Sequence, residues 1–421
     1  MNGPRRSRIL GAYLRTRIAA ATLTRRAALE AHQQRLWRRL APALAATPAL
    51  RALAGRPLAA FAVVTPAQVR ADVAAWNSLD LTADAARAAA EAAEAGRDGG
   101  LPGGVQAGFS TGGGDGARGL FITTPAERDD YLGTLLGKLI EPGRLLRPLR
   151  AALILRANNR LYQDIQGAGA AFAFIGLDAG PDRQLAALEA FAPTHLVAPP
   201  HVLAALAAWI EAGGWRPRLD GLFYGAEPIG ALEQAWLGEV FGGAPRPLYQ
   251  ATEGFLGAPC RHGTLHLNED GLIVELEPVA GTDRFTPIVT DLRRRGQPMV
   301  RVRLDDLIRP LDEPCPCGSL RLAIHSVEGR LGDVWRFGEV AIPPREIDSR
   351  IENALGPRAI WTARGGPGAA WIEVAAPADP EPARAAVEAL LRARGVPVSV
   401  TASAGPGREP GPKRRRVRWT P

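Results

Sequence analysis

Short apolar runs alternate with helical segments through the middle of the chain. The runs are AALILRA (151–157), AAFAFIGL (170–177), THLVAP (194–199) and LDGLFYG (219–225), and a helical segment follows each one, such as HVLAALAAWIEAG after the third. Short apolar strands that alternate with helices of about ten residues or more are typical of βαβ units. The pattern therefore predicts an α/β fold whose main sheet is mostly parallel.

Two other patterns flank this alternation. Residues 8–54 and 66–96 are rich in Ala, Leu and Arg, and we predict that they are helical. From 247 to 327 the chain changes to short strands and turns, in segments such as GLIVELEP and PMVRVRLDDLIRP. These segments predict a β-rich subdomain packed beside the parallel sheet.

The chain divides into three predicted parts. Its 421 residues are too many for one ordinary core. We expect a helical N-terminal segment (1–100), a core that contains the β-rich subdomain (101–330), and a small α+β domain (333–421). The boundary before the small domain is the segment GRLGD, after which helices and strands alternate again.

Charge is distributed unevenly along the chain. The formal net charge is +8, and residues 1–60 hold a dozen Arg and a single acid, Glu30. Such a basic segment could bind nucleic acid or an anionic membrane, but no aromatic-interleaved recognition motif accompanies it. We therefore favour a solvated helix face. No apolar run is long enough for a membrane span and no secretory signal is evident, so a cytoplasmic location is expected.

Lysine is almost absent from the basic residues. Only Lys138 and Lys413 occur, and every other basic residue is Arg. A lysine persists where a compact ammonium must reach a small cluster of oxygens. Lys138 lies in a helical segment, and we expect it to be a solvated surface group. His195 and His201 flank LVAPP, and we interpret them as polar groups at the end of a strand.

A glycine-rich stretch, STGGGDGARGLF, covers residues 110–121. Consecutive glycines allow backbone N–H groups to converge on an anion, and Ser110, Thr111 and Arg118 add donors and charge. Asp115 argues against a phosphate, because like charges repel. By itself the stretch is either a phosphate cradle or a linker.

Three further motifs lie near predicted strand ends. YQATEG contains Thr252 and Glu253, a hydroxyl and a carboxylate that suit phosphate and magnesium. YGAEP (224–228) ends a predicted strand, which is where open α/β sheets bind ligands. RVRLDDLIRP places Asp305 and Asp306 at another strand end, where a carboxylate could accept both hydroxyls of a ribose. Each motif alone could be an ordinary turn or a surface acid pair.

Together and in this order, the motifs resemble the adenylate-forming superfamily. The branch most similar to this chain is that of phenylacetate–CoA ligases and of synthetases that adenylylate a deazaflavin coenzyme. The resemblance runs from about residue 105 to the C-terminus and also includes GRLGD and GPKRRRV. It implies a large N-terminal domain followed by a small C-terminal domain that swivels about a hinge.

The resemblance also implies roles for individual residues. Lys413 would be the catalytic lysine, Thr252 and Glu253 would contact phosphate and magnesium, and Asp306 would bind the ribose. Gly332 and Asp333 would form the hinge. The remaining residues implied to bind ATP or AMP are Ser110, Thr111, Gly112, Gly113, Gly114 and Arg118 in the loop, Gly225, Ala226, Glu227 and Pro228 at the adenine, Tyr249, and Arg330.

All three cysteines lie in two short clusters. Cys260 and His262 follow the Thr-Glu motif, and Cys315 and Cys317 follow the strand with the ribose carboxylate. Three thiolates and one imidazole suit a tetrahedral structural zinc, and the alternative is three reduced thiols without a metal. Similar pairs in some phenylacetate–CoA ligase relatives agree with zinc. His266 is expected to be a strand or packing residue.

The function implied is that of an AMP-forming ligase that uses ATP and magnesium to activate a carboxylic acid, aryl or acyl, as an acyl adenylate. The acyl group would then pass to CoA or to a carrier-protein thiol. Three alternatives stay open: adenylyl transfer to a coenzyme, a degenerate nucleotide binder, and a basic nucleic-acid-associated protein. Pairing into a homodimer is common among relatives and stays open for this chain.

Overall fold

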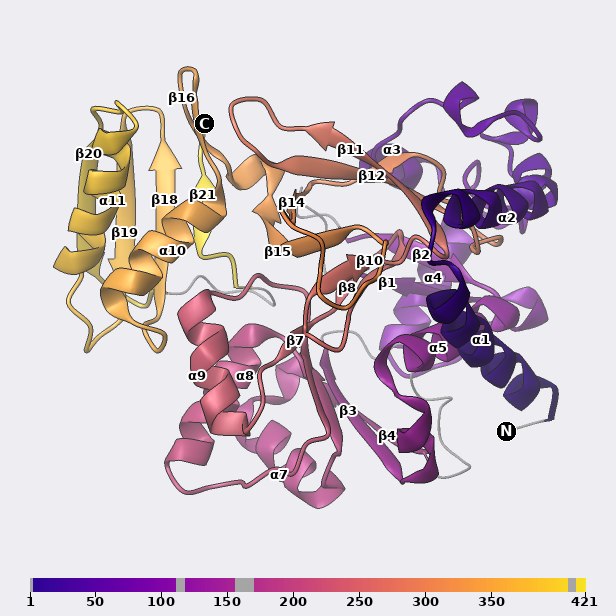
Figure 1. Cartoon of the computed structure of the whole chain (residues 1–421), viewed down its shortest axis with the longest axis horizontal. Coiled ribbons are helices and arrows are strands. Elements are labelled where there is room, and N and C mark those ends of the chain that lie inside the picture. Colours follow the sequence, from indigo (N-terminus) through magenta and orange to yellow (C-terminus); the bar gives the residue numbers. More distant parts are fainter. Residues whose placement is uncertain (1–2, 111–117, 156–169, 408–413) are drawn as a thin grey trace.

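A five-stranded parallel sheet forms the centre of the lower half of the molecule (Figure 1). The computed structural model describes residues 3–110, 118–155, 170–407 and 414–421. Within these residues the strand order is β4-β3-β5-β6-β7, and every neighbouring pair is parallel, as the apolar alternation predicts. The strands are β3 (Leu149–Leu155), β4 (Ala170–Gly176), β5 (His195–Ala198), β6 (Gly221–Tyr224) and β7 (Arg246–Pro247).

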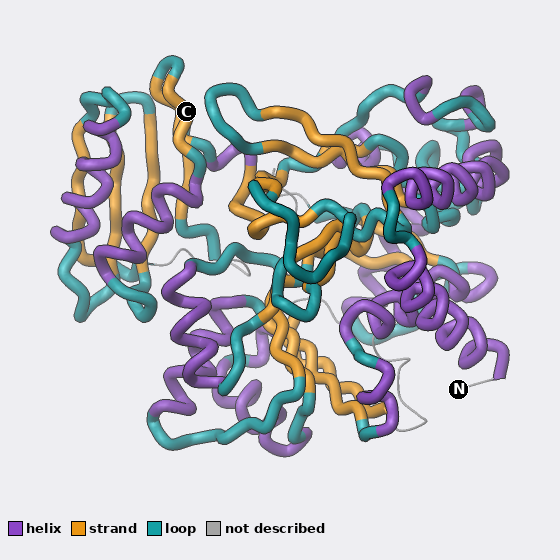
Figure 2. The backbone as a smooth tube through the Cα atoms, viewed as in Figure 1, coloured by secondary structure: helices purple, strands orange, loops and turns teal. Residues whose placement is uncertain are grey.

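Helices cover both faces of this sheet (Figure 2). On one face, Leu188, Leu203 and Leu237 are fully buried against the strands. They come from α7 (Pro181–Phe191), α8 (Pro200–Glu211) and α9 (Ala231–Phe241), respectively. On the other face α5 (Pro125–Leu139) contributes Leu132 to a smaller apolar cluster with β3 and β4. The parallel sheet is thus the middle layer of three.

A second, mostly antiparallel sheet follows in sequence and lies above the first in Figure 1. Its strand order is β11-β12-β14-β15-β10-β9-β8, with β13 paired to β12. The β-rich segment expected from the short strands and turns is therefore present. Its strands are β8 (Tyr249–Ala251), β9 (Gly254–Pro259), β10 (Leu265–Leu267), β11 (Leu272–Pro278), β12 (Phe285–Asp291), β13 (Val302–Arg303), β14 (Asp306–Pro310) and β15 (Ala323–Arg330).

The N-terminal residues are helical, but in shorter pieces than the sequence predicts. The first expected helix divides into α1 (Gly3–Thr22) and α2 (Arg26–Ala46). The second divides into α3 (Pro66–Ala71) and α4 (Ala83–Glu94). Between α3 and α4, the Asn77 side chain bonds to backbone groups at both ends of a turn, which competes with helix formation. Short 3-10 turns lie at Arg51–Leu53, Leu58–Ala60, Pro102–Gly104, Pro142–Leu146 and Leu177–Ala179.

Helix α1 lies against α5 at very close range. A Cβ atom on Gly133 would lie 2.2 Å from the backbone oxygen of Ile9, and one on Gly137 would lie 2.8 Å from Thr16 Cβ. Glycine is needed at these positions because a side chain would push the two helices apart. Basic residues of α1 pair with acids on and just after α5: Arg5 and Arg8 with Asp129, Arg15 with Asp130, and Arg17 with Glu141.

The last part of the chain forms a separate sheet with two helices. We refer to residues Trp335–Pro421, as far as they are described, as the C-terminal unit; it lies at the left of Figure 1. Its four-stranded sheet has the order β20-β19-β18-β21, and β16 pairs with β17 beside it. The elements are β16 (Trp335–Phe337), β17 (Val340–Ile342), α10 (Pro344–Leu355), β18 (Trp361–Gly366), β19 (Ala369–Val374), α11 (Glu381–Ala393), β20 (Ser399–Ala404) and β21 (Val417–Trp419). Among the described helices of the whole chain, none combines the length and the apolar character that a membrane crossing requires.

Candidate functional site

One cavity is bordered by segments from every motif singled out in the sequence. Its volume is about 860 Å³, and it lies where the parallel sheet, the β-rich sheet and the C-terminal unit meet. Glu253 and Asp306 both line it, although they are far apart in sequence. The other described residues that were singled out from the sequence and line the cavity are Ser110, Arg118, Gly225, Ala226, Glu227, Pro228, Tyr249, Thr252, Arg330 and Asp333.

The glycine-rich stretch connects the two strands of a hairpin, β1 (Gln106–Phe109) and β2 (Leu120–Thr123). The two ends of the loop are fastened together, since Ser110 N donates to Gly119 O (2.8 Å) and Gly119 N donates to Ser110 Oγ (2.9 Å). A Cβ on Gly119 would lie 2.3 Å from Thr252 Oγ1, so the loop meets the Thr-Glu motif at its base. Thr111, Gly112, Gly113 and Gly114 lie outside the described residues.

Arg118 lies at the cavity wall but is already paired. Its Nη1 donates to Glu94 Oε2 at 2.9 Å, and its guanidinium lies 4.5 Å from the centre of the Phe109 ring. To bind a phosphate, Arg118 would therefore have to leave its ion pair with Glu94. Glu94, at the end of α4, was not singled out from the sequence.

The GAEP segment forms the turn after β6. Ala226 has a φ of 71°, a left-handed conformation that an L-residue adopts at a cost in energy and that is typical of functional turns. Glu227 is buried, and its Oε1 accepts hydrogen bonds from His201 Nδ1 and from Arg414 N, each at 2.7 Å. Its Oε2 has no hydrogen-bond partner among the described residues. His201 therefore supports a cavity residue instead of merely ending a strand.

Tyr249, Asp306 and Arg330 form a connected group on the β-rich sheet. The Tyr249 hydroxyl donates to Asp306 Oδ2 at 2.7 Å, and Arg330 Nε lies 3.2 Å from Asp306 Oδ1. The charge of Asp306 raises the pKa of Arg330, while burial and then Asp306 raise the pKa of Tyr249 well above its usual range. The Asp306 side chain is thus fixed at the cavity edge by Tyr249 and Arg330.

Glu253 is buried in the cavity wall with little compensation for its charge. Burial raises its pKa, and a backbone hydrogen bond and the charge of Arg294 only partly oppose this shift. Asp291 lies in the same wall, and burial raises its pKa as well. Two carboxylates with raised pKa values gain most from an added cation, and oxygen ligands of this kind suit Mg²⁺. Asp291 was not singled out from the sequence.

The expected hinge is a short 3-10 turn, Leu331–Asp333, between β15 and β16. A Cβ on Gly332 would meet no atom within 4 Å, so the space around this residue is open. Asp333 is buried and pairs with Arg415. Burial raises the pKa of Asp333, and Arg415 only partly offsets the effect.

The chain returns to the cavity near its C-terminus. Lys413 lies outside the described residues. Its neighbour Arg414 lines the cavity and bonds to Glu227 and to Glu233, with distances of 2.7 and 2.9 Å from its guanidinium to the two Glu233 oxygens. Neither Arg414 nor Glu233 was singled out, because nothing in the local sequence distinguishes them from other charged residues.

The fourth residue beside the three cysteines is a different histidine from the one expected. Cys260, Cys315, Cys317 and His266 have donor atoms within 4.8 Å of one another. His262 is outside this group: it lies on the exposed turn between β9 and β10 and contacts Arg261. The turn directs His262 to solvent, whereas strand β10 buries His266 beside the thiols. The structure thus places His266, and not the expected His262, beside the thiols, and His266 is also the buried strand residue that the sequence predicts.

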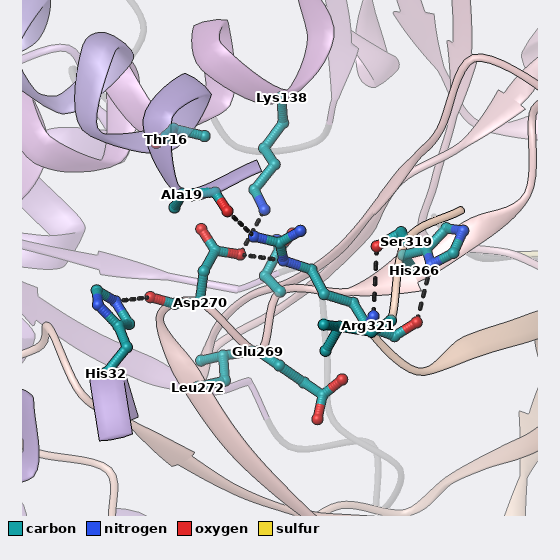
Figure 3. A network of polar contacts seen from close by, with 12 residues as sticks. Thr16, Ala19, His32, Lys138, His266, Glu269, Asp270, Leu272, Ser319 and Arg321 are labelled. Atoms are coloured by element: carbon teal, nitrogen blue, oxygen red, sulfur yellow. Dashed lines mark hydrogen bonds and ion pairs between the residues drawn. The ribbon is translucent and has the colours of Figure 1, made fainter. Parts of the chain in front are cut away.

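Lys138 is also placed differently from the prediction. Instead of being solvated, it is buried under α1, and its Nζ lies 2.5 Å from Asp270 Oδ1 (Figure 3). Arg321 Nε approaches the same oxygen at 3.1 Å. Burial alone would raise the pKa of Asp270, but Lys138 and Arg321 more than offset it and hold the pKa well below its usual range. The expectation failed because helix α1, distant in sequence, covers this side of α5.

Known proteins resemble this chain in structure but not detectably in sequence. No family model matches the sequence, and no curated protein matches it. A 2-hydroxyisobutyryl-CoA ligase, solved in the postadenylation state with 2-HIB-AMP, superposes with a TM-score of 0.66 at 17% identity over 93% of this chain and 89% of that one. The amide bond synthetase McbA from Marinactinospora thermotolerans gives a TM-score of 0.52 at 17% identity over 73% of this chain and 67% of that one. This chain therefore shares the fold of these two enzymes.

Proposed function

We propose that this chain is an ATP-dependent, AMP-forming ligase that activates a carboxylic acid as an acyl adenylate. The observation that carries the proposal is the meeting of Thr252, Glu253, Asp306 and Arg330 around one cavity large enough for a nucleotide and a small acid. A structural neighbour solved with an acyl adenylate agrees with this chemistry.

The proposed reaction follows from the charges around the cavity. An oxygen of the substrate carboxylate attacks the α-phosphorus of ATP, and the bond from that phosphorus to the bridging oxygen breaks. Pyrophosphate leaves with the electron pair. Because negative charge is redistributed over phosphate oxygens, the protein contributes mainly positioning and electrostatic stabilisation.

Each part of the nucleotide has a candidate partner. Asp306, fixed by Tyr249 and Arg330, would accept the ribose hydroxyls. Thr252, beside the base of the glycine-rich loop, would donate to a phosphate. Glu253, with Asp291 nearby, would hold magnesium, which when bound neutralises phosphate charge.

Lys413 is the proposed catalytic cation, bridging the substrate carboxylate and the α-phosphate. It directly precedes Arg414, a cavity residue, and it is one of only two lysines in the chain. The other, Lys138, is already paired with Asp270. The acyl group would then pass to a thiol, of CoA or of a carrier protein: the sulfur attacks the carbonyl carbon and AMP leaves.

An isotope-exchange assay tests this proposal. Wild-type protein should exchange labelled pyrophosphate into ATP when the cognate acid is present, in a screen that begins with 2-hydroxyisobutyrate and extends to aryl, fatty and amino acids. Lys413→Ala should lower exchange by about a hundredfold or more, because it removes charge stabilisation from the reacting centre. The matched control Arg392→Ala removes an exposed cation on α11 and should leave exchange unchanged.

Two results would count against the ligase. Exchange at the wild-type rate in Lys413→Ala would remove this lysine from the site. Binding of Mg-ATP without pyrophosphate release on any acid would indicate a nucleotide-binding protein without catalysis. A stable adenylylated product in place of a thioester would instead indicate transfer of AMP to an acceptor.

We also propose that Cys260, His266, Cys315 and Cys317 bind a structural zinc. Three thiols and one imidazole match a closed tetrahedral site. His266 Nδ1 lies 3.0 Å from the Arg321 carbonyl oxygen, an arrangement that orients the ring and leaves Nε2, 3.3 Å from Cys317 Sγ, for the metal.

Metal analysis of two histidine variants tests the zinc site. Purified wild-type protein should contain about one zinc per chain, and His266→Ala should lose it. His262→Ala, a substitution of the same type four residues away, should retain the zinc. The reverse result, with zinc lost from the His262 variant and kept in the His266 variant, would contradict this assignment.

A further inference from the structure

Charged side chains from two parts of the C-terminal unit contact the first turn of helix α9. Arg414 and Arg416 lie just before β21, and both form ion pairs with the carboxylate of Glu233. Glu352, on α10, reaches the backbone at the start of the same helix. We refer to Glu233, Glu352, Arg414 and Arg416 as the α9 latch.

The side chain of Glu233 is the buried centre of the latch. It is completely inaccessible to solvent, and Arg414 engages both of its oxygens at 2.7 and 2.9 Å. Arg416 Nη1 lies 3.2 Å from Glu233 Oε2 and 3.4 Å from Asp348 Oδ1 of α10. Burial alone would raise the pKa of Glu233, but the two arginines reverse the effect and lower it. The two arginines of the C-terminal unit therefore favour the ionised form of Glu233 in this arrangement.

Glu352, which also belongs to the C-terminal unit, caps the N-terminus of helix α9. Its Oε1 accepts from Glu233 N at 3.0 Å, and its Oε2 accepts from Leu232 N at 3.2 Å. A carboxylate at this end of a helix satisfies free N–H groups and favours the helix dipole. Gly230 makes room for it, because a Cβ there would lie 1.8 Å from Glu352 Oε1.

These contacts have a consequence for the segment that follows Lys413. Arg414 bonds through its guanidinium to Glu233 and through its backbone N–H to Glu227 in the cavity wall. The segment is thus held against the core at two points, one inside the cavity and one outside it. Glu233 itself does not line the cavity.

We infer that Glu233 is a positioning residue for adenylate formation: through Arg414 and Arg416 it holds the C-terminal unit in the orientation that places Arg414, the sequence neighbour of the proposed catalytic Lys413, at the cavity. This inference rests on the proposed ligase function. Glu352 helps by attaching α10 to the same turn of α9. If the C-terminal unit rotates for transfer of the acyl group to the thiol, all of these contacts must break together. The latch therefore favours two distinct orientations of the unit, docked and released.

Hydrogen exchange measures the latch without reference to activity. In wild-type protein the amides of Leu232 and Glu233, and the Arg414 amide, should be protected. Glu233→Gln should speed their exchange by about tenfold or more, the factor that corresponds to loss of charge-assisted hydrogen bonds. Glu388→Gln is the matched control, since Glu388 pairs with Arg384 and Arg392 on the outer helix α11. Glu352→Ala removes the α10 side chain that accepts from the Leu232 and Glu233 amides. It provides a second test if the first variant does not fold.

Kinetics then separate positioning from general stability. In Glu233→Gln, kcat for pyrophosphate exchange should fall while the KM for ATP changes by no more than about twofold, and Mg-ATP should still bind. Unchanged amide protection and unchanged kcat, relative to Glu388→Gln, would overturn the inference. If protection is lost as expected but no acid supports exchange in wild-type protein, the ligase proposal fails and the inferred role of Glu233 in adenylation fails with it, while the docking contact itself stands.

Discussion

Two buried aspartates that border the same cavity have opposite electrostatic environments. Asp270 lies under the N-terminal helices, where Lys138 and Arg321 are both buried and lower its pKa. Asp333 lies at the expected hinge, where Arg415 is more than a third exposed and burial raises the pKa of the carboxyl. The first charge is fully compensated by the fold, whereas the second is not.

The surroundings of the two aspartates differ in the same way. Helix α1 touches α5 through glycines, so that backbone meets backbone, and Arg321 also donates to Ala19 O of α1. The C-terminal unit instead meets the core through charged side chains, such as Arg414 with Glu227 and Glu233. Close backbone packing cannot be separated without a large loss of contact, whereas ion pairs can exchange partners with water. We therefore predict that the N-terminal helices stay docked on the core and that the C-terminal unit can separate from it.

The largest expected effect is at Lys138. Lys138→Met leaves the buried Asp270 with Arg321 as its remaining ion-pair partner, and loss of one partner of a buried pair lowers the free energy of unfolding by about 3 kcal/mol or more. Arg17→Met is the control at the same interface: the Arg17–Glu141 pair is exposed and should contribute about 1 kcal/mol or less. Urea unfolding measures both. Equal losses in the two variants would show that the Asp270 cluster does not fasten the N-terminal helices.

A smaller effect is expected from the glycines between α1 and α5. Gly133→Ala places a Cβ against the backbone oxygen of Ile9 and should lower the free energy of unfolding by about 1–3 kcal/mol. Gly11→Ala makes the same change where a Cβ would meet nothing within 4 Å, and it should raise that free energy by up to about 1 kcal/mol. Opposite signs in thermal unfolding would support the permanent interface, and a neutral Gly133→Ala would contradict it.

Much of the fold was predictable because its signals are local. The four apolar runs became β3 to β6 within a few residues of the expected limits, since a buried parallel strand must be apolar along its whole length. The motifs were also local, and the cavity brings together most of their residues that the structure describes. The breaks within the N-terminal helices were missed, because a side-chain turn such as that of Asn77 leaves little trace in hydrophobic periodicity.

The errors concern residues whose environment is made by distant parts of the chain. Lys138 and Asp270 are 132 residues apart, and nothing around Lys138 shows that α1 will cover it. Arg414 and Glu233 are 181 residues apart, and each is one of many charged residues. His262 and His266 both follow Cys260 within a few residues, and nothing in the local sequence shows that the turn between β9 and β10 separates the first of them from the thiols.

The smallest and most specific effect is a pH dependence of opposite sign at the two aspartates. Asp270 has a lowered pKa in the folded state, so its favourable contribution is complete above the pKa of the unfolded chain, about 3.9, and is lost as the pH falls below it. Asp333 has a raised pKa, so its contribution is unfavourable at neutral pH and disappears as the pH falls through that raised value.

Urea midpoints of wild type, Asp270→Asn and Asp333→Asn at pH 7, 5 and 3.5 would separate the two cases. The advantage of wild type over Asp270→Asn should hold from pH 7 to 5 and shrink by pH 3.5. Relative to Asp333→Asn, wild type should instead gain stability as the pH falls, because protonation of Asp333 removes the cost of its buried charge. If both differences moved in the same direction with pH, the charge at the hinge would be as well compensated as the one under α1, and the contrast between a permanent and a separable interface would lose its electrostatic basis.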